Sequence, residues 1–409
     1  MLARRKPRPT GKLLMIVSLL GLVISLFAYL IAFPDERTRR FDIYAGLLAL
    51  HILGAIGFWL MSFESAMDAF LYYRDPYRFI NQDPFASGTY FVVHFVQGLR
   101  SWLGGSFLDH FLFFQCFGMI GMALLIRSLN DIALSLETRV PTPIYLTLFL
   151  PGLHFWTAGI GKDGPMLMAI CLAGWAALRL DKRFVWMGLA LVVMVCVRPH
   201  ITPFVMAGVV GSLLLSKRVS ARAKVFLAPV AAAGLVVLLT KAATSLNISL
   251  DSESVSGFVE GQQQLGDRFG SGADLRSLPL PLKVFSLLYR PFWFDAAGMT
   301  QYAASAENTF LLGLSAYIVF HWRLLLSLAR NVFYVMYFII FDALLILSLS
   351  LVSYNIGMGQ RMKMMAVPGI LILFATLYIY KRSMAARLIV AAPPEPLQEP
   401  GGHKAPAQA

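Results

Sequence analysis

Charged residues are scarce in this chain. Of its 409 residues only 14% are charged, whereas 58% are hydrophobic, and the mean hydropathy is +0.67. A soluble domain has about 25% charged residues. The composition therefore excludes an ordinary soluble protein and indicates that lipid is the solvent for much of the surface.

Negative charge is the scarcer of the two signs, with 22 Asp and Glu against 35 Lys and Arg. In a soluble protein this excess would suggest nucleic acid. Here the basic residues stand mostly in short runs beside apolar segments, which is typical of cytoplasmic loops on membrane proteins. We therefore expect membrane lipids, and no nucleic acid, as partners.

Cysteines and soluble-enzyme motifs are also few or absent. The three cysteines lie in apolar stretches without paired spacing, so we expect neither disulfides nor a thiolate metal site. The chain lacks a phosphate-binding Gly-rich loop, the His-Glu-x-x-His zinc motif, a serine nucleophile elbow and a dinucleotide fingerprint. We expect no metal and no cofactor.

Long apolar runs are abundant. A transmembrane helix needs about 20 apolar residues, and this length predicts an all-α polytopic membrane protein with about ten crossings in one domain, residues 1–391. The predicted tail, 392–409, is rich in Pro, Gly, Gln and Glu and is expected to be a disordered cytoplasmic segment. The expected crossings are 13–33, 43–63, 107–126, 142–160, 164–179, 184–216, 225–243, 308–326, 332–353 and 363–381.

One of these runs is interrupted. Arg198-Pro199-His200 divides 184–216 into two apolar pieces, each short for a full crossing. Proline breaks the helical hydrogen-bond ladder, and non-helical backbone at membrane depth must be satisfied by protein or water. The run is either one broken helix or two short helices that meet at the tripeptide.

The distribution of Lys and Arg predicts an orientation. The basic segments 179–183, 217–224 and 323–330 and the tail after Lys381 are assigned to the inside, so the polar loop at about 244–280 falls outside. Everything from residue 107 onward fits this scheme. The basic leader at 4–12, read as preceding a retained first helix, does not fit. Either a short crossing through 89–104 or an external amino terminus would restore the alternation.

Four polar sets fall at the outer ends of the expected helices. Ionisable groups in a membrane are costly and mark function by default. Cations at an outer face are expected to meet an anion, namely a phosphate, a diphosphate or a carboxylate. The sets are His154 and Trp156 with Lys162-Asp163; Arg198-Pro199-His200; Tyr289-Arg290-Pro291-Phe292 with Glu307-Asn308; and Asn355 with Gln360-Arg361 and Lys363.

Each set also has a structural interpretation. Lys162 and Asp163 could form a helix-end pair, and Arg198 could extend to the headgroups. The two histidines could be structural, and Arg361 with Lys363 could be interfacial anchors. Four such sets on one face favour a shared anionic ligand.

An acidic residue with aromatic neighbours follows the second apolar run. Asp68 precedes Tyr72 and Tyr73. An acid at a helix end followed by aromatic rings suits a sugar site, in which the acid acts as a base and the rings stack on the sugar. An interfacial aromatic belt is the alternative.

Several of these motifs resemble a bacterial family. The run Phe155 to Asp163 resembles an "FWSSGxxKD" segment, with Thr157-Ala158 in place of the serines. Residues 198–200 match an "RPH" element, and 289–292 resemble "FRPF". Residues 355–361 resemble "NxGTxxRQR", although Met358 and Gly359 depart from that pattern. These segments are found in O-antigen polymerase-like (Wzy-like) and other GT-C-type membrane glycosyltransferases.

The resemblance implies a GT-C-like architecture with short broken or re-entrant helices, in the bacterial inner membrane with an extracytoplasmic active face. It implies a glycosyltransferase or polymerase of polyprenyl-diphosphate-linked sugars in exopolysaccharide or O-antigen synthesis, with other polysaccharide-assembly proteins as candidate partners. The alternatives are a flippase for the lipid-linked unit and a non-catalytic membrane partner. The expected bases are Asp163, His200 and Asp68, and the expected diphosphate or sugar contacts are Lys162, Arg198, Arg290, Arg361, Gln360, His154 and Trp156.

Overall fold

The computed structural model describes residues 16–64, 68–74, 87–217, 220–269, 277–353 and 355–391. Every regular element in these ranges is a helix, which confirms the all-α prediction. The basic leader at 4–12 and the tail predicted at 392–409 lie outside the described residues.

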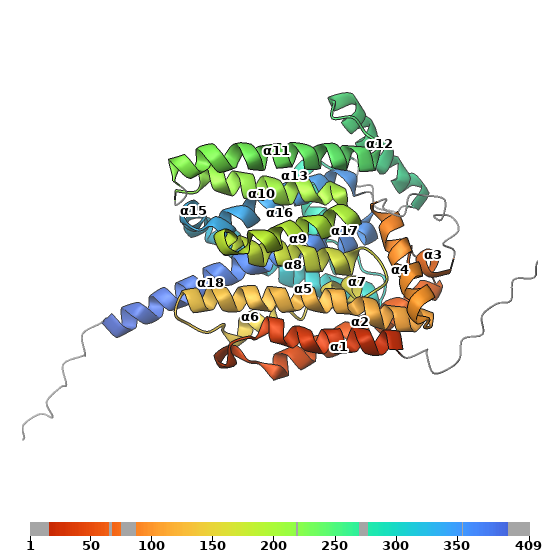
Figure 1. Cartoon of the computed structure of the whole chain (residues 1–409), viewed down its shortest axis with the longest axis horizontal. Coiled ribbons are helices and arrows are strands. Elements are labelled where there is room, and N and C mark those ends of the chain that lie inside the picture. The colour runs from red at the N-terminus through yellow and green to blue at the C-terminus, as the bar shows by residue number, and fades with distance from the viewer. Residues whose placement is uncertain are drawn as a thin grey trace, which may run out of the picture.

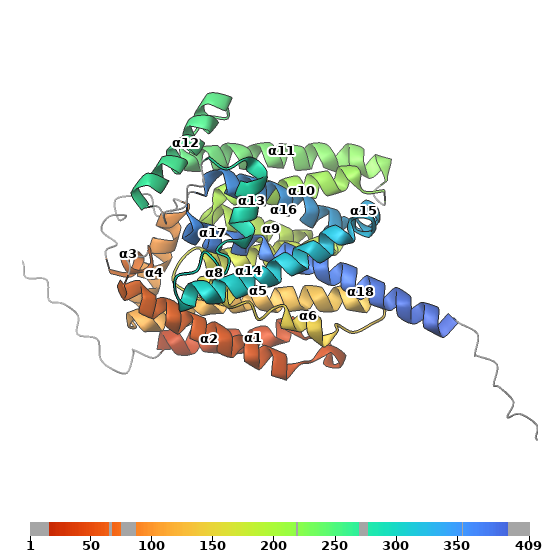
Figure 2. The same ribbon diagram turned by 180° about the vertical axis from the view of Figure 1, so that it is seen from behind.

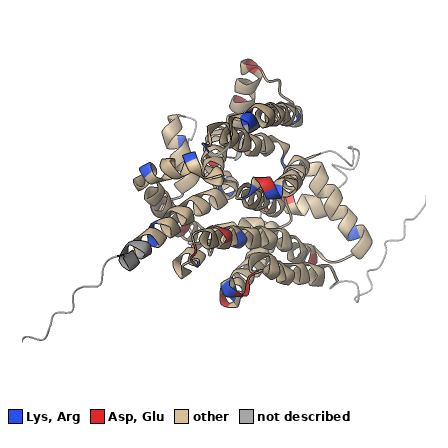
Figure 3. Ribbon diagram, turned by 60° about the vertical axis from the view of Figure 1, so that its left-hand side comes forward, with Lys and Arg blue, Asp and Glu red and all other residues tan. Residues whose placement is uncertain are grey.

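Long helices lie roughly side by side and form the body of the molecule (Figures 1 and 2). Most of the ribbon carries no charged residue (Figure 3). The long helices are α1 (Ile16–Ala32), α2 (Phe41–Glu64), α5 (Phe107–Ser135), α8 (Asp163–Ala177), α9 (Leu180–Val197), α10 (Thr202–Leu215), α11 (Ala221–Leu246), α14 (Met299–Phe320), α16 (Phe333–Val352) and α18 (Val367–Ala391).

Shorter helices connect the long ones or lie across their ends. They are η1 (Glu36–Thr38), α3 (Asp68–Arg74), α4 (Thr89–Leu103), α6 (Thr142–Leu146), α7 (Pro151–Thr157), η3 (Pro199–Ile201), α12 (Ser252–Phe269), α13 (Leu280–Tyr289), α15 (Trp322–Asn331), α17 (Ile356–Met362) and η4 (Lys363–Met365). The sequence predicted a polar loop where α12 forms, and this helix projects from one end of the body (Figure 2).

Five described helices are long and apolar enough to cross a membrane, and the pair formed by 356–365 and α18, bent by 54°, makes six. The chain thus has the helices of a membrane protein. The length and composition of the described helices do not confirm the expected ten crossings. The expected span 142–160 is wrong as a single helix, because it is split into α6 and α7. Helix α8 has only 15 residues.

Burial explains why hydropathy alone does not fix the number of crossings. In the apolar 18-residue stretch of α5, 78% of the residues are buried within the protein, whereas in that of α11 only 6% are. The side chains of α8 are almost all buried as well. An apolar sequence is needed both for contact with lipid and for burial inside a helical bundle. The sequence therefore cannot separate the helices that face lipid from those that fill the core.

The break predicted within 184–216 is confirmed. Helix α9 ends at Val197, a short 3-10 turn begins at Pro199, and α10 starts at Thr202. The structure has two helices that meet at the tripeptide, with Arg198 between them in a non-helical conformation.

Helix α4 runs across one end of the bundle and does not cross it. Before its start, the amide of Gly88 donates to the carbonyl of Cys196, 2.8 Å away, near the end of α9. After its end, Gly105 packs against Val17 at the start of α1. Both ends of α4 therefore lie at the same end of the molecule. Two ways to restore the alternation of inside and outside loops were predicted, and the structure does not have the first of them, a crossing through 89–104. Helix α1 begins at the end of the molecule where α9 finishes (Figure 1).

Candidate functional site

Asp163, the first residue of α8, accepts hydrogen bonds from two arginines. Arg198 Nη2 lies 2.5 Å from its Oδ1, and Arg361 Nε lies 2.6 Å from its Oδ2. The arginines come from the α9–α10 break and from α17. The side chains of Asp163 and Arg198 are only 5% and 7% exposed, whereas Arg361 is 25% exposed. The expected convergence of three of the polar sets is thus present around one carboxylate.

Two further charged residues, Asp68 and Lys162, lie next to Asp163 and its two arginines. The Nη1 of Arg361 also lies 3.5 Å from an oxygen of Asp68, whose side chain is 51% exposed. Lys162 donates to the hydroxyl of Thr89 at 2.7 Å. We refer to Asp68, Lys162, Asp163, Arg198 and Arg361 as the charge cluster. Its three cations exceed its two carboxylates by one charge.

Breaks in the helices make room for the charge cluster. Gly161 lies beside the Arg361 guanidinium, where a Cβ would be 3.8 Å from Nη2. A Cβ on Gly164 would lie 2.6 Å from the Thr157 carbonyl oxygen, so the tight turn between α7 and α8 requires glycine there. These small residues let the start of α8 approach its neighbours closely enough for Asp163 to reach both arginines.

The charge cluster is recessed below the end of the bundle. Gly164 also packs against the backbone of α5 near Gly118. Gly118 lies about three turns into α5, or about 16 Å from its start. At this depth Asp163 and Arg198 are buried, whereas Arg361 and Asp68 are 25% and 51% exposed, so the charge cluster is open to solvent on their side.

Burial and neighbouring cations lower the pKa of Lys162 to about 8, with burial as the larger cause and Arg198 as the next. Asp68 and Asp163 offset only part of this effect, so a further anion next to Lys162 would stabilise its ammonium group. Burial raises the pKa of Tyr72 to about 12, and its hydroxyl is hydrogen-bonded to Thr89. Tyr72 thus presents a neutral phenol next to the charge cluster.

Arg290, expected to bind diphosphate, is occupied elsewhere. Its guanidinium donates to both oxygens of Asp295 at 2.8 and 3.0 Å and lowers the pKa of that carboxyl. Its carbonyl accepts a hydrogen bond from the side-chain amide of Gln360. The structure therefore links Arg290 to the charge cluster only through Gln360, the residue beside Arg361.

His154 and Trp156 were expected to contact the substrate, but the structure does not place them at the charge cluster. His154 is fully buried, with Nδ1 2.9 Å from Nδ1 of His51 and Nε2 3.0 Å from the Leu148 carbonyl oxygen. Trp156 packs on Phe58. For His154 the structural interpretation holds. His200 is half-buried, and Arg198 and Lys162 are close enough to affect its charge.

Lys363 is not an interfacial anchor, because it is completely buried. It donates to the Leu288 carbonyl oxygen at 3.1 Å and to the Asn308 side chain. The neighbouring Glu307 accepts a hydrogen bond from the Gly152 amide. These contacts fix η4 against α7, α13 and α14.

Thr89 carried no recognisable signal in the sequence, since an isolated threonine at a helix start is common.

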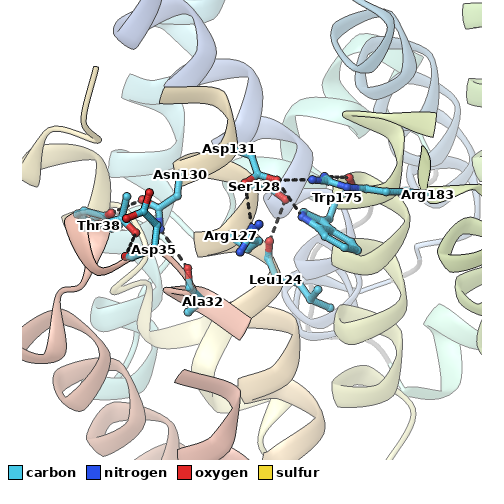
Figure 4. A network of polar contacts seen from close by, with 11 residues as sticks. Ala32, Asp35, Thr38, Leu124, Arg127, Ser128, Asn130, Asp131, Trp175 and Arg183 are labelled. Atoms are coloured by element: carbon cyan, nitrogen blue, oxygen red, sulfur yellow. Dashed lines mark hydrogen bonds and ion pairs between the residues drawn. The ribbon is translucent and has the colours of Figure 1, made fainter. Parts of the chain in front are cut away.

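A second aspartate lies between two arginines at the opposite end of α5 (Figure 4). Asp131 accepts from Arg127 at 2.9 Å and from Arg183 at 2.7 Å. The indole Nε1 of Trp175 donates to it at 3.1 Å, and Arg183 stacks over the Trp175 ring. This group, the Asp131 brace, fastens α5 to the turn between α8 and α9.

The chain matches no family model, no curated protein and no solved structure.

Proposed function

We propose that the chain is a membrane-embedded glycosyltransferase or polymerase that acts on polyprenyl-diphosphate-linked sugars in bacterial cell-surface polysaccharide synthesis. The observation that supports this most is the charge cluster itself. Lys162, Arg198 and Arg361 converge from three helix breaks with one charge in excess of the carboxylates. Excess positive charge in a recessed site is best compensated by a diphosphate.

The chemistry follows from where negative charge develops. When the bond between the sugar C1 and the diphosphate oxygen breaks, the electron pair stays on the diphosphate. Arg361 and Lys162 are positioned to stabilise that charge, which is electrostatic stabilisation of the transition state. The acceptor hydroxyl forms the new bond to C1 and gives its proton to a carboxylate.

Asp68 is the best candidate for that carboxylate. Both oxygens of Asp163 are already engaged by arginines at 2.5 and 2.6 Å, so Asp163 orients the cations. The Asp68 side chain is half exposed and touches Arg361 only at 3.5 Å. Asp68 can therefore reach an incoming hydroxyl while staying next to the diphosphate cations. His200, which lies beside Arg198, is the second candidate.

The distribution of basic residues supports an extracytoplasmic face for the charge cluster. The end of the bundle away from the cluster holds the α1–α2 turn, the α8–α9 turn, α15 and the outer part of α18 (Figure 1). Lys and Arg concentrate on cytoplasmic segments. The basic residues at this end include Arg37, Arg39, Arg40, Arg179, Lys182, Arg183, Lys217, Arg323, Arg330, Lys381 and Arg382.

The test is to replace Arg361 by Gln in the polysaccharide-producing cell and to follow the lipid-linked unit. We expect polymer formation to fall by about 10²- to 10³-fold, as when one stabilising donor is removed from an active site. The lipid-linked unit should then accumulate on the outer face. Arg127→Gln, in the Asp131 brace, is the matched control and should leave polymer unchanged.

Other outcomes would overturn the proposal. Accumulation of the lipid-linked unit on the inner face would indicate a flippase. Unchanged polymer in Arg361→Gln would indicate a non-catalytic membrane partner.

A further inference from the structure

Asp342 lies in the middle of a membrane-spanning helix without a partner. It is the tenth of the 20 residues of α16 and the only charged residue in that helix. Its side chain is 5% exposed, and neither carboxyl oxygen has a hydrogen-bond partner. A helix of this length reaches across the hydrocarbon core, so Asp342 is near the membrane midplane.

The space around this carboxyl group is shaped by a glycine. Gly369, in the first turn of α18, lies directly against Asp342, and a Cβ at position 369 would overlap both carboxyl oxygens. Gly369 follows the 54° bend that separates 356–365 from α18. A glycine at this point thus provides the room in which the Asp342 carboxyl group is held.

The surroundings provide no positive charge. No described Lys, Arg or His forms an ion pair with Asp342. Among the described residues, Tyr337 on the same helix is close enough to interact with Asp342, and Cys171 on α8 is close enough to interact with Tyr337. Both are neutral at physiological pH, and the Tyr337 hydroxyl likewise lacks a hydrogen-bond partner.

We infer that Asp342 is a proton-binding site at the middle of the membrane, occupied by a proton at neutral pH. An ionised carboxylate without a partner is strongly disfavoured at this depth, and protonation removes the charge. A metal cation would need several further oxygen ligands, whereas a proton needs only the carboxylate. This inference does not depend on the proposed function.

Proton occupancy should be linked to the bend next to Gly369. When Asp342 gives its proton to water, the carboxylate that remains lies unpaired against the first turn of α18. Helix α18 is joined through η4 to α17, which carries Arg361. Binding of a proton therefore favours the packed arrangement of α16 and α18, because the two states differ in the cost of the buried charge.

The experiment is infrared difference spectroscopy of the full-length protein in lipid bilayers, wild type minus Asp342→Asn, at neutral and alkaline pH. We expect the carbonyl stretching band of a protonated carboxylic acid in the wild type at neutral pH and its loss in Asp342→Asn. The band should persist at a pH at which exposed carboxyl groups are fully ionised. Glu307→Gln, which alters another buried acid, one that accepts a hydrogen bond from the Gly152 amide, should leave the Asp342 band in place.

Two outcomes would overturn the inference. One is a difference spectrum at neutral pH that contains carboxylate bands in place of the protonated band. The other is conversion of the protonated band to carboxylate on addition of sodium at constant pH, which would assign the site to a metal cation. Asp342→Leu serves as the reference if Asp342→Asn does not fold.

Discussion

The charge cluster and the Asp131 brace are built on the same unit, an aspartate between two arginines, but they differ in where the partners come from. In the Asp131 brace, Arg127 lies one turn away on the same helix and Arg183 is 52 residues away. In the charge cluster, the arginines are 35 and 198 residues from Asp163. The Asp131 brace thus has one partner within its own helix, whereas both arginines of the charge cluster come from other segments of the chain.

The two units also differ in the continuity of the backbone around them. Asp131 and Arg127 lie within the continuous helix α5, and the Trp175 indole completes the hydrogen bonding of Asp131. In this unit only Arg183 stands at a kink, in α9. Asp163, Arg198 and Arg361 all lie at or near helix breaks. Non-helical backbone at membrane depth is costly and is kept where it lines a polar site. The comparison separates a structural brace from a site that can accept a ligand.

The largest expected effect is on stability at the charge cluster. Asp163→Ala leaves Arg198 buried without its partner, which should lower the free energy of unfolding by about 3–5 kcal/mol. Chemical denaturation of the purified protein in detergent measures this. Asp163→Leu combined with Arg198→Met should cost less than the single change, because it removes both buried charges. An Asp163→Ala protein as stable as wild type would contradict the buried ion pair.

A smaller loss of stability is expected at the Asp131 brace. Asp131→Ala removes three hydrogen bonds. Because Asp131 and Arg183 are 14% and 13% exposed, water partly replaces the lost hydrogen bonds. We expect a loss of about 1.5–3 kcal/mol in the same denaturation assay. Polymer formation per folded molecule should stay at the wild-type level. A loss of polymer without unfolding would remove the distinction between the two units.

The pH dependence of anion binding tests the charge cluster alone. Lys162 is charged below its pKa of about 8 and neutral above it. The affinity for inorganic diphosphate should therefore fall by about tenfold as the pH rises through 8, the size expected for one charged hydrogen bond. Isothermal titration calorimetry measures the affinity. Lys162→Gln should bind more weakly at neutral pH and show no such fall, and an equal fall in that variant would refute the assignment.

The smallest effect is expected for Arg127→Gln. The pair of Arg127 and Asp131 is one helical turn apart and partly exposed, so its loss should cost about 0.3–0.5 kcal/mol. A shift in the denaturation midpoint as large as that of Asp131→Ala would show that Arg127 carries more of the brace than its exposure indicates.

The sequence predicts the helical class, the break at Arg198 and the gathering of Asp163 with two distant arginines. These predictions succeed because a charge within an apolar run needs a partner. Arg290 and His154 were assigned to the ligand site but have protein partners, since a sequence does not show that Asp295 or His51 lies close by. The sequence also does not fix the number of crossings, because burial in protein and contact with lipid require the same residue types.

Helix α4, lying across one end of the bundle, has a practical consequence for experiments on cells. Because α1 and α2 are the two long helices that precede it, α1 starts at the end that holds the charge cluster, while α18 leaves the bundle at the other end (Figure 1). Reporter proteins fused ahead of Ile16 and behind Ala391 should therefore sense different compartments, however the short inner helices are counted.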